Sequence, residues 1–243
     1  EIILTNTFST NRYALDRHGA SDRVQELARA GAAISQRAAG DTARVFGSIG
    51  PTGKVVMMEE INRDDFLSAF REASMGLSAA GVDAIVLETC NELEELTLAL
   101  QAVRECCDLP VIACMSFTAG PDGTATMMGN SPEDLAKAAE KHGADAVGAN
   151  CGIGPDNYLK VARRLREETS LPVWIKPNAG APEVGPDGET TFPVGPEDFA
   201  GYVPQFLRSG FNFMGGCCGT TPEHIRSMRK ELDAYMEDRG EKG

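Results

Sequence analysis

The feature that most constrains the fold is a pattern that runs through the whole chain, in which a short apolar strand is followed by a turn and an amphipathic helix. Seven such units are predicted, and their repetition implies parallel strands joined by right-handed crossovers. The predicted strands cover residues 2–8, 45–49, 83–87, 111–115, 145–149, 173–176 and 211–214. The predicted helices cover residues 22–39, 64–80, 93–106, 155–168 and 196–209, and two more begin at Ser131 and Pro222.

Two α/β architectures fit this repeat, a doubly wound sheet and a (β/α)8 barrel. The units are regular, no linker interrupts them, and polar or reactive residues follow the strands, all of which favours the barrel. The chain begins at Glu1 inside a strand, and one further unit before it would bring the count to eight. We therefore predict a (β/α)8 TIM-type barrel whose first strand unit is missing, as one N-terminally incomplete domain over residues 1–243.

Charge and cysteine content narrow the classes of function. The chain has 36 acidic and 23 basic residues, a net charge of −13, which argues against a nucleic-acid partner. No apolar run approaches the ~20 residues that span a bilayer, so no membrane partner is predicted. Seven cysteines without the spacing of a disulfide scaffold indicate intracellular thiols or metal ligands. We expect a cytoplasmic protein, although the sequence leaves a removed targeting segment open.

Two adjacent cysteines, Cys217 and Cys218, follow the last predicted strand. Neighbouring side chains of a strand point to opposite faces, so both thiols can reach one metal only where the backbone leaves the strand. Glycines supply that freedom on both sides of the pair: Gly215, Gly216 and Gly219. The helix after them is predicted to begin with Thr221 as its N-cap.

A third thiol, Cys151, follows the fifth predicted strand. In a barrel the carboxyl ends of all strands open on one face, so Cys151 is predicted to meet Cys217 and Cys218 there. Three thiolates around zinc leave one tetrahedral position open, as in catalytic sites. Packing of the cysteines is one alternative, and a closed structural site with Cys90 as fourth ligand is another. For the remaining cysteines packing is the preferred account: Cys106, Cys107 and Cys114.

The predicted ligand set indicates the chemistry. A zinc with three thiolates carries a formal charge of −1, which makes it a poor generator of hydroxide. It suits a soft fourth ligand, a thiol, which loses its proton and remains nucleophilic. Methyl transfer to sulfur is the reaction that fits. Other polar residues at strand ends are candidate substrate contacts, although turn formation explains the asparagines equally well: Thr7, Glu88, Asn150 and Asn178.

Two motifs resemble the zinc motifs of the homocysteine S-methyltransferase family, Gly216–His224 and Gly148–Cys151. The resemblance runs from Glu1 to about Leu232 and is closest to the homocysteine-binding module of cobalamin-dependent methionine synthase. Shorter matches occur in the same order along the chain: residues 4–8, 50–53, 87–89 and 176–180. The resemblance implies a (β/α)8 barrel with zinc on Cys151, Cys217 and Cys218, and Glu88 bound to the amino group of homocysteine.

The predicted function is therefore zinc-dependent S-methyl transfer to a thiol, homocysteine first among candidates, to give methionine. The methyl donor is predicted to be a corrinoid on a separate protein or domain, methyltetrahydrofolate acting through one, or a sulfonium or ammonium compound. Two alternatives stay open. One is a zinc methyltransferase that takes methyl groups from another substrate in a corrinoid pathway, and the other is a catalytically silent, zinc-stabilised barrel.

Overall fold

The structure is a computed structural model that describes residues 1–240. The chain divides into two compact units, the first made of residues 1–115 and 137–147 and the second of residues 116–136 and 148 onward. Strand β5 (Ala146–Cys151) and helix α5 (Pro132–Lys141) contribute residues to both units. The prediction of one domain over residues 1–243 stays a prediction, and its last three residues lie outside the described part.

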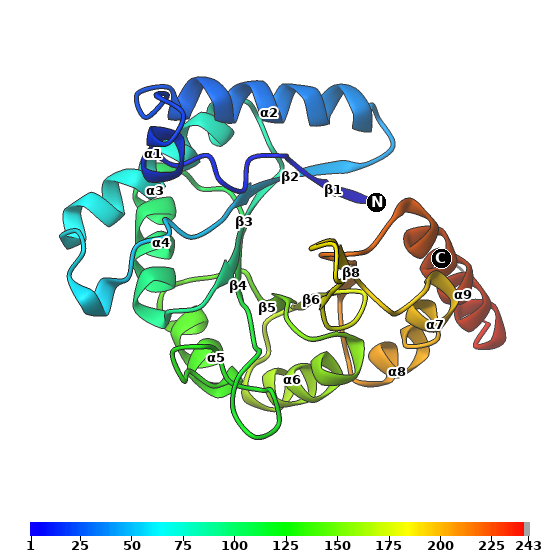
Figure 1. Cartoon of the computed structure of the whole chain (residues 1–243). Coiled ribbons are helices and arrows are strands. Elements are labelled where there is room, and N and C mark those ends of the chain that lie inside the picture. Colours follow the sequence, from blue (N-terminus) through cyan, green and yellow to red (C-terminus); the bar gives the residue numbers. More distant parts are fainter. Residues whose placement is uncertain (241–243) are drawn as a thin grey trace. The chain divides into compact units, whose positions relative to one another are not determined.

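Unit 1 is built on parallel strands in the order β1-β2-β3-β4. The strands are β1 (Ile2–Leu4), β2 (Arg44–Ile49), β3 (Ala84–Cys90) and β4 (Val111–Met115). The helices are α1 (Arg12–Asp16), α2 (Val24–Ala39), the 3-10 helix η1 (Val56–Met58), α3 (Arg63–Ala79) and α4 (Leu93–Cys106). Helices α2, α3 and α4 lie along the same side of these strands (Figure 1).

The core of unit 1 follows from its apolar strands. The run Ala84–Leu87 is at most 1% exposed, as expected for a parallel strand that is buried on both faces. Helix α3 buries Phe66, Phe70 and Leu77 on one face. Its start is fixed by Asn62, whose side chain accepts a hydrogen bond from the backbone N–H of Asp65 at 2.9 Å.

Unit 2 contains the end of β5, then β6 (Val173–Pro177), which pairs in parallel with β9 (Phe213–Met214). Between β6 and β9 lies an antiparallel hairpin of β7 (Glu183–Val184) and β8 (Thr190–Thr191). The helices are α6 (Pro155–Glu168), α7 (Pro196–Ala200), α8 (Val203–Arg208) and α9 (Pro222–Asp238). Residues of α7, α8 and α9 share an apolar cluster that includes Phe199, Val203 and Met228.

The predicted α/β class and parallel strands are confirmed, and the bounds of α4, α6 and β4 are those predicted. The single helix predicted over residues 196–209 is wrong, because the chain forms α7 and α8 with Gly201 and Tyr202 between them. Strand β1 ends at Leu4 rather than at residue 8, and the loop predicted after β6 contains the β7–β8 hairpin. The missing first unit stays a prediction.

Within residues 1–240, no helix combines the length and the apolarity that crossing a bilayer requires.

Candidate metal centre

The three predicted zinc ligands lie together in unit 2. Cys151 ends β5, and Cys217 and Cys218 lie in the loop between β9 and α9. Their Sγ atoms are all within 4.8 Å of one another, so this group of cysteines in the described part of the chain could hold a metal ion. Cys151 and Cys217 are partly buried, whereas Cys218 is exposed. One side of the cluster is therefore open to a ligand from solvent.

The backbone turns sharply where Cys151 leaves β5. Cys151 has φ +70° and Gly152 has φ +72°, so two consecutive residues adopt the left-handed conformation. Such a conformation is unfavourable for cysteine and persists only when neighbouring contacts hold it. Tyr158 is one of those contacts, since its hydroxyl donates to the carbonyl of Asn150 at 2.7 Å. A Cβ on Gly152 would lie 2.2 Å from the Tyr158 ring, so only glycine fits.

The glycines around Cys217 and Cys218 act differently from the prediction. Gly219 does adopt a positive φ of +78°, but Gly215 and Gly216 do not. Gly216 is required by close packing instead, because a Cβ there would lie 2.4 Å from the Thr220 side chain. The hydroxyl of Thr220 donates to the carbonyl of Cys217 at 2.7 Å and closes the loop. The helix start is as predicted: Thr221 is the N-cap of α9, and its N–H donates to Nδ1 of His224 at 3.1 Å.

Asn178 joins the two cysteine loops. Its side-chain N–H donates to the carbonyl of Gly152 at 2.7 Å, and its side-chain oxygen accepts from the backbone N–H of Cys218 at 2.9 Å. Its own backbone N–H donates to the carbonyl of Cys151 at 3.0 Å. The side chain is only 3% exposed. The residue predicted to contact substrate is therefore engaged with the loops that carry the cysteines.

Asn150 lies next to one of the cysteine sulfurs, and its predicted contact with substrate stays a prediction. Its side chain is fully buried, and its Nδ2 lies 3.8 Å from Sγ of Cys217. N–H groups aimed at a thiolate stabilise its negative charge. Lys176, whose motif was noticed only as part of the resemblance, is also buried, and its positive charge favours ionisation of Cys217. The sequence signal that could have identified Lys176 is a lysine at the end of an otherwise apolar predicted strand.

Without a metal the three thiols differ in acidity. A hydrogen bond from the Cys217 thiol lowers the pKa of Cys151 to about 7, against the opposing effect of burial. The same hydrogen bond, together with burial, raises the pKa of Cys217 far above its ordinary value. Burial raises the pKa of Cys218. Cys151 is therefore the first of the three thiols to ionise as pH rises.

Thr7 and Glu88, the other predicted substrate contacts, both belong to unit 1. The Thr7 hydroxyl donates to the carbonyl of Ser48 at 2.7 Å, and the Ser48 hydroxyl donates to a carboxylate oxygen of Glu88. Thr5 completes this buried network, with its Oγ1 2.5 Å from Oγ1 of Thr7. The Thr7 hydroxyl thus links the loop after β1 to β2. Glu88 places a buried carboxylate near the end of β3. Ser48 was missed, although a serine inside an apolar strand marks a buried polar contact.

The remaining cysteines also lie in unit 1. Cys90 and Cys114 are buried, and burial raises the pKa of Cys90 well above its ordinary value. The thiols of Cys106 and Cys107 both donate to the carbonyl of Val103 at 3.5 Å, as packed helix-end cysteines do. The alternative with Cys90 as a fourth ligand stays a prediction.

Comparison with known proteins gives a consistent family. The family model described as homocysteine S-methyltransferase matches residues 1–232. Among curated relatives, methionine synthase of Mycobacterium tuberculosis (strain ATCC 25618 / H37Rv) is 33% identical, over 94% of this chain and 20% of the relative. Methionine synthase of Mycobacterium leprae (strain TN) is 31% identical with the same coverage. The chain spans about a fifth of the length of these relatives.

Solved structures resemble this chain over nearly its whole length. The homocysteine methyltransferase MmuM from Escherichia coli, in its metallated form, matches with a TM-score of 0.71 and 22% identity, over 94% of this chain and 78% of that one. The dihydrodipicolinate synthase DapA-2 from Bacillus anthracis matches with a TM-score of 0.55 and 13% identity, over 98% of this chain and 64% of that one. At these identities the likeness concerns the fold alone.

Proposed function

Because the chain belongs to the homocysteine S-methyltransferase family and is a methyltransferase, we propose that it transfers a methyl group to the sulfur of homocysteine and forms methionine. The observation that supports this proposal is the convergence of Cys151, Cys217 and Cys218 within 4.8 Å. The relatives named methionine synthase are consistent with it.

The cysteine cluster suits zinc. Three sulfurs at about 2.3 Å from one tetrahedral zinc lie about 3.8 Å apart, so separations of no more than 4.8 Å require only small side-chain movements. The donors are all thiols, which favours a soft metal. Zinc held in this way offers its remaining position to a thiol and favours the loss of the thiol's proton. The exposed side of Cys218 is where such a thiol has access.

The residues around the cluster hold this arrangement in place. Asn178 fixes the distance between the two cysteine loops through both ends of its amide. Asn150 places an N–H near Cys217, and Lys176 supplies a positive charge near the same sulfur, so both offset the negative charge of three thiolates. In the reaction the substrate sulfur gives up its proton to solvent and forms the new S–CH3 bond. The donor leaves with the electron pair of the bond to carbon that breaks.

We assign Glu88 to the amino group of homocysteine. Its carboxylate is 6% exposed at the end of β3, and one oxygen already accepts a hydrogen bond from Ser48. A buried carboxylate with such support is a suitable partner for an ammonium group. For the donor we propose a methyl-corrinoid on a separate protein or domain. A different methylated donor in a corrinoid pathway and a silent zinc protein are the competing functions.

X-ray absorption of the zinc-loaded chain tests the site. We expect three sulfurs around zinc at rest and four after homocysteine is added. Cys151→Ser should lower the sulfur count and the bound zinc, whereas Cys107→Ser, which changes a packed thiol in unit 1, should leave both unchanged. Four sulfurs at rest, with one lost in Cys90→Ser, would establish the structural alternative instead.

Analysis of the reaction products distinguishes between the proposed methyl donors. Methionine should form from homocysteine and methylcobalamin, and the activity should be lost together with zinc in Cys218→Ser. If none of methylcobalamin, a methyl sulfonium and a methyl ammonium compound gives methionine while the zinc still takes up homocysteine as a fourth sulfur, then the substrate assignment is right and the donor assignment is wrong. Absence of both outcomes would leave the silent zinc protein.

A further inference from the structure

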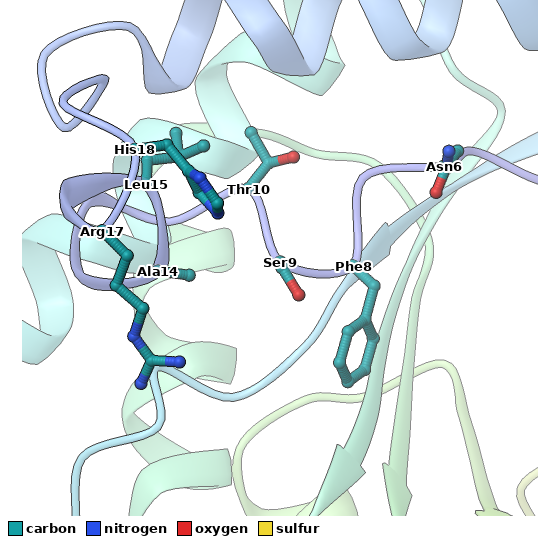
Figure 2. A pocket seen from close by; sticks show the side chains of 8 residues that line it. All are labelled: Asn6, Phe8, Ser9, Thr10, Ala14, Leu15, Arg17 and His18. Carbon is teal, nitrogen blue, oxygen red and sulfur yellow. The ribbon is translucent and has the colours of Figure 1, made fainter. Parts of the chain in front are cut away.

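Unit 1 has a pocket of about 520 Å³ that none of the proposed chemistry uses. It lies where the chain passes from β1 to α1, and its volume falls in the range of small-molecule sites. Figure 2 shows Phe8 and Ser9 on one side of the pocket and Ala14 and Arg17, from α1 and the residue after it, on the other. The lining residues are Asn6, Phe8, Ser9, Thr10, Ala14, Leu15, Arg17 and His18.

Phe8 forms a rigid aromatic wall of this pocket. A Cβ on Gly50 would lie 2.5 Å from Cε2 of the Phe8 ring, so the glycine lets the ring pack directly on the backbone. The backbone N–H of Gly50 also donates to the carbonyl of Phe8 at 2.9 Å, which fixes the residue further. The ring is nevertheless 39% exposed. An immobilised ring with an exposed part is a ready surface for a flat apolar ligand.

The polar side chains that line the pocket have no hydrogen-bond or ion-pair partner among the described residues. Within residues 1–240, none of the five makes a side-chain hydrogen bond or an ion pair: Asn6, Ser9, Thr10, Arg17 and His18. The arginine at the start of α1 behaves differently, since Arg12 binds both carboxylate oxygens of Glu72. Four of these side chains, those of Asn6, Ser9, Arg17 and His18, are exposed to solvent, so a ligand could bind them in place of water, next to a fixed aromatic ring.

The charge of these groups indicates the class of ligand. Arg17 brings a permanent positive charge to a chain whose net charge is −13, and no carboxylate lines the pocket with it. A guanidinium binds a carboxylate through two parallel hydrogen bonds, and hydroxyls such as that of Ser9 can add further donors. We propose that this pocket binds a compact aromatic carboxylate, with its ring against Phe8 and its carboxylate on Arg17.

Ligand-observed NMR with the full chain and three probes tests the proposal. Benzoate carries both features, benzyl alcohol keeps the ring without the charge, and acetate keeps the charge without the ring. We expect benzoate to bind about tenfold more tightly than either of the others, because only benzoate uses Phe8 and Arg17 together. Equal binding of acetate would overturn the aromatic part of the proposal. No saturation transfer to benzoate at millimolar concentration would overturn the whole.

Variants locate the binding. Arg17→Gln should weaken benzoate about tenfold and leave benzyl alcohol unchanged, whereas Phe8→Leu should weaken both aromatic probes. Arg37→Gln removes the same charge from an exposed position on α2 and should change neither. An equal effect of Arg17→Gln and Arg37→Gln would mean that net charge alone attracts benzoate, which contradicts the site. Circular dichroism of each variant checks that the fold is retained.

Discussion

The side-chain oxygen of Asn178 accepts a hydrogen bond from the backbone N–H of Cys218 at 2.9 Å, while the same amide donates to the loop of Cys151. One side chain, directly after β6, therefore links the loops of two thiols that are 67 residues apart in the chain, Cys151 and Cys218. Side chains that hold metal ligands in position commonly have a strong effect on metal affinity, although they do not touch the metal themselves.

Asn178→Ala should consequently lower zinc affinity about 10- to 100-fold without unfolding the protein. Chelator competition on the purified chain measures this effect directly and needs no enzyme assay. Asn91→Ala, which removes an amide from unit 1 that bonds only weakly to Thr89, is the matched control and should bind zinc normally. Unchanged zinc affinity in Asn178→Ala would show that the cysteine loops keep their spacing without the amide.

Tyr158 holds the turn at Cys151, where the backbone has a positive φ, through a hydrogen bond to the preceding residue. Its hydroxyl is buried, and it donates to the carbonyl of Asn150 at 2.7 Å. Tyr158→Phe keeps the ring that packs on Gly152 but removes the hydroxyl that donates to Asn150 and accepts from the backbone N–H of Phe117, so we expect a loss of about 1–3 kcal/mol in the free energy of unfolding. Urea denaturation measures it. Tyr235→Phe, on the partly exposed surface of α9, should change stability by less than about 0.5 kcal/mol.

The convergence of the cysteines could be predicted because it depends on topology. Cys151 and the tandem pair follow strands, and parallel strands present their carboxyl ends at one edge. The roles of Asn150 and Asn178 could not be predicted, because an amide at a strand end can face a ligand, a sulfur or a loop with the same sequence. Only the distances to Cys217 and Gly152 distinguish these cases.

The helix error had a different origin. Apolar residues continue at helical spacing through residues 196–209, so periodicity predicts one helix. Gly201 is nevertheless the C-cap of α7 and Tyr202 the N-cap of α8, and Pro204 lies in the first turn of α8, where its missing N–H costs nothing. Gly201 and Pro204 together were the available signal. At Gly216 the residue was rightly singled out for the wrong reason, since packing on Thr220 and not a positive φ requires it.

Ionisation of the buried carboxyl of Glu95 should lower the stability of unit 1 as pH rises towards neutrality. Its side chain is 3% exposed, and burial raises its pKa above 4.5 despite hydrogen bonds from the N–H and hydroxyl of Thr52. The folded state therefore holds this proton more tightly than the unfolded state, and stability falls as pH rises from about 4.5 through the folded pKa. Glu95→Gln keeps an oxygen for Thr52 and removes the charge.

We expect Glu95→Gln to raise the unfolding midpoint at pH 7 and to leave it unchanged at about pH 3, where the wild-type carboxyl is protonated in both states. Thermal unfolding of both proteins at the two pH values provides the measurement. Glu60→Gln, at an exposed position before α3 in the same unit, is the control for loss of one negative charge. A stabilisation of equal size at both pH values would contradict a pKa origin.

The ion pair of Glu133 and Arg164 should produce the opposite pH dependence in unit 2. The Arg164 guanidinium donates to both carboxylate oxygens of Glu133 at 2.6 Å and to the hydroxyl of Thr124 at 2.6 Å. This hydrogen bonding lowers the pKa of Glu133 to about 2 from 4.5. The pair therefore stabilises the folded state above about pH 4.5, and that contribution disappears as pH falls towards 2.

Because both side chains are partly exposed, at 37% for Arg164 and 26% for Glu133, solvent screening limits the contribution to at most about 1 kcal/mol. Glu133→Gln should lower the free energy of unfolding at pH 7 by that amount and match the wild type near pH 2. Arg164→Lys should lose most of it too, since an ammonium cannot form the two parallel bonds of a guanidinium. Asp233→Asn, which breaks the exposed pair with Arg229 on α9, is the control, and urea denaturation between pH 2 and pH 7 is the measurement. A Glu133→Gln protein as stable as the wild type at pH 7 would mean that the pair contributes nothing to the fold of unit 2.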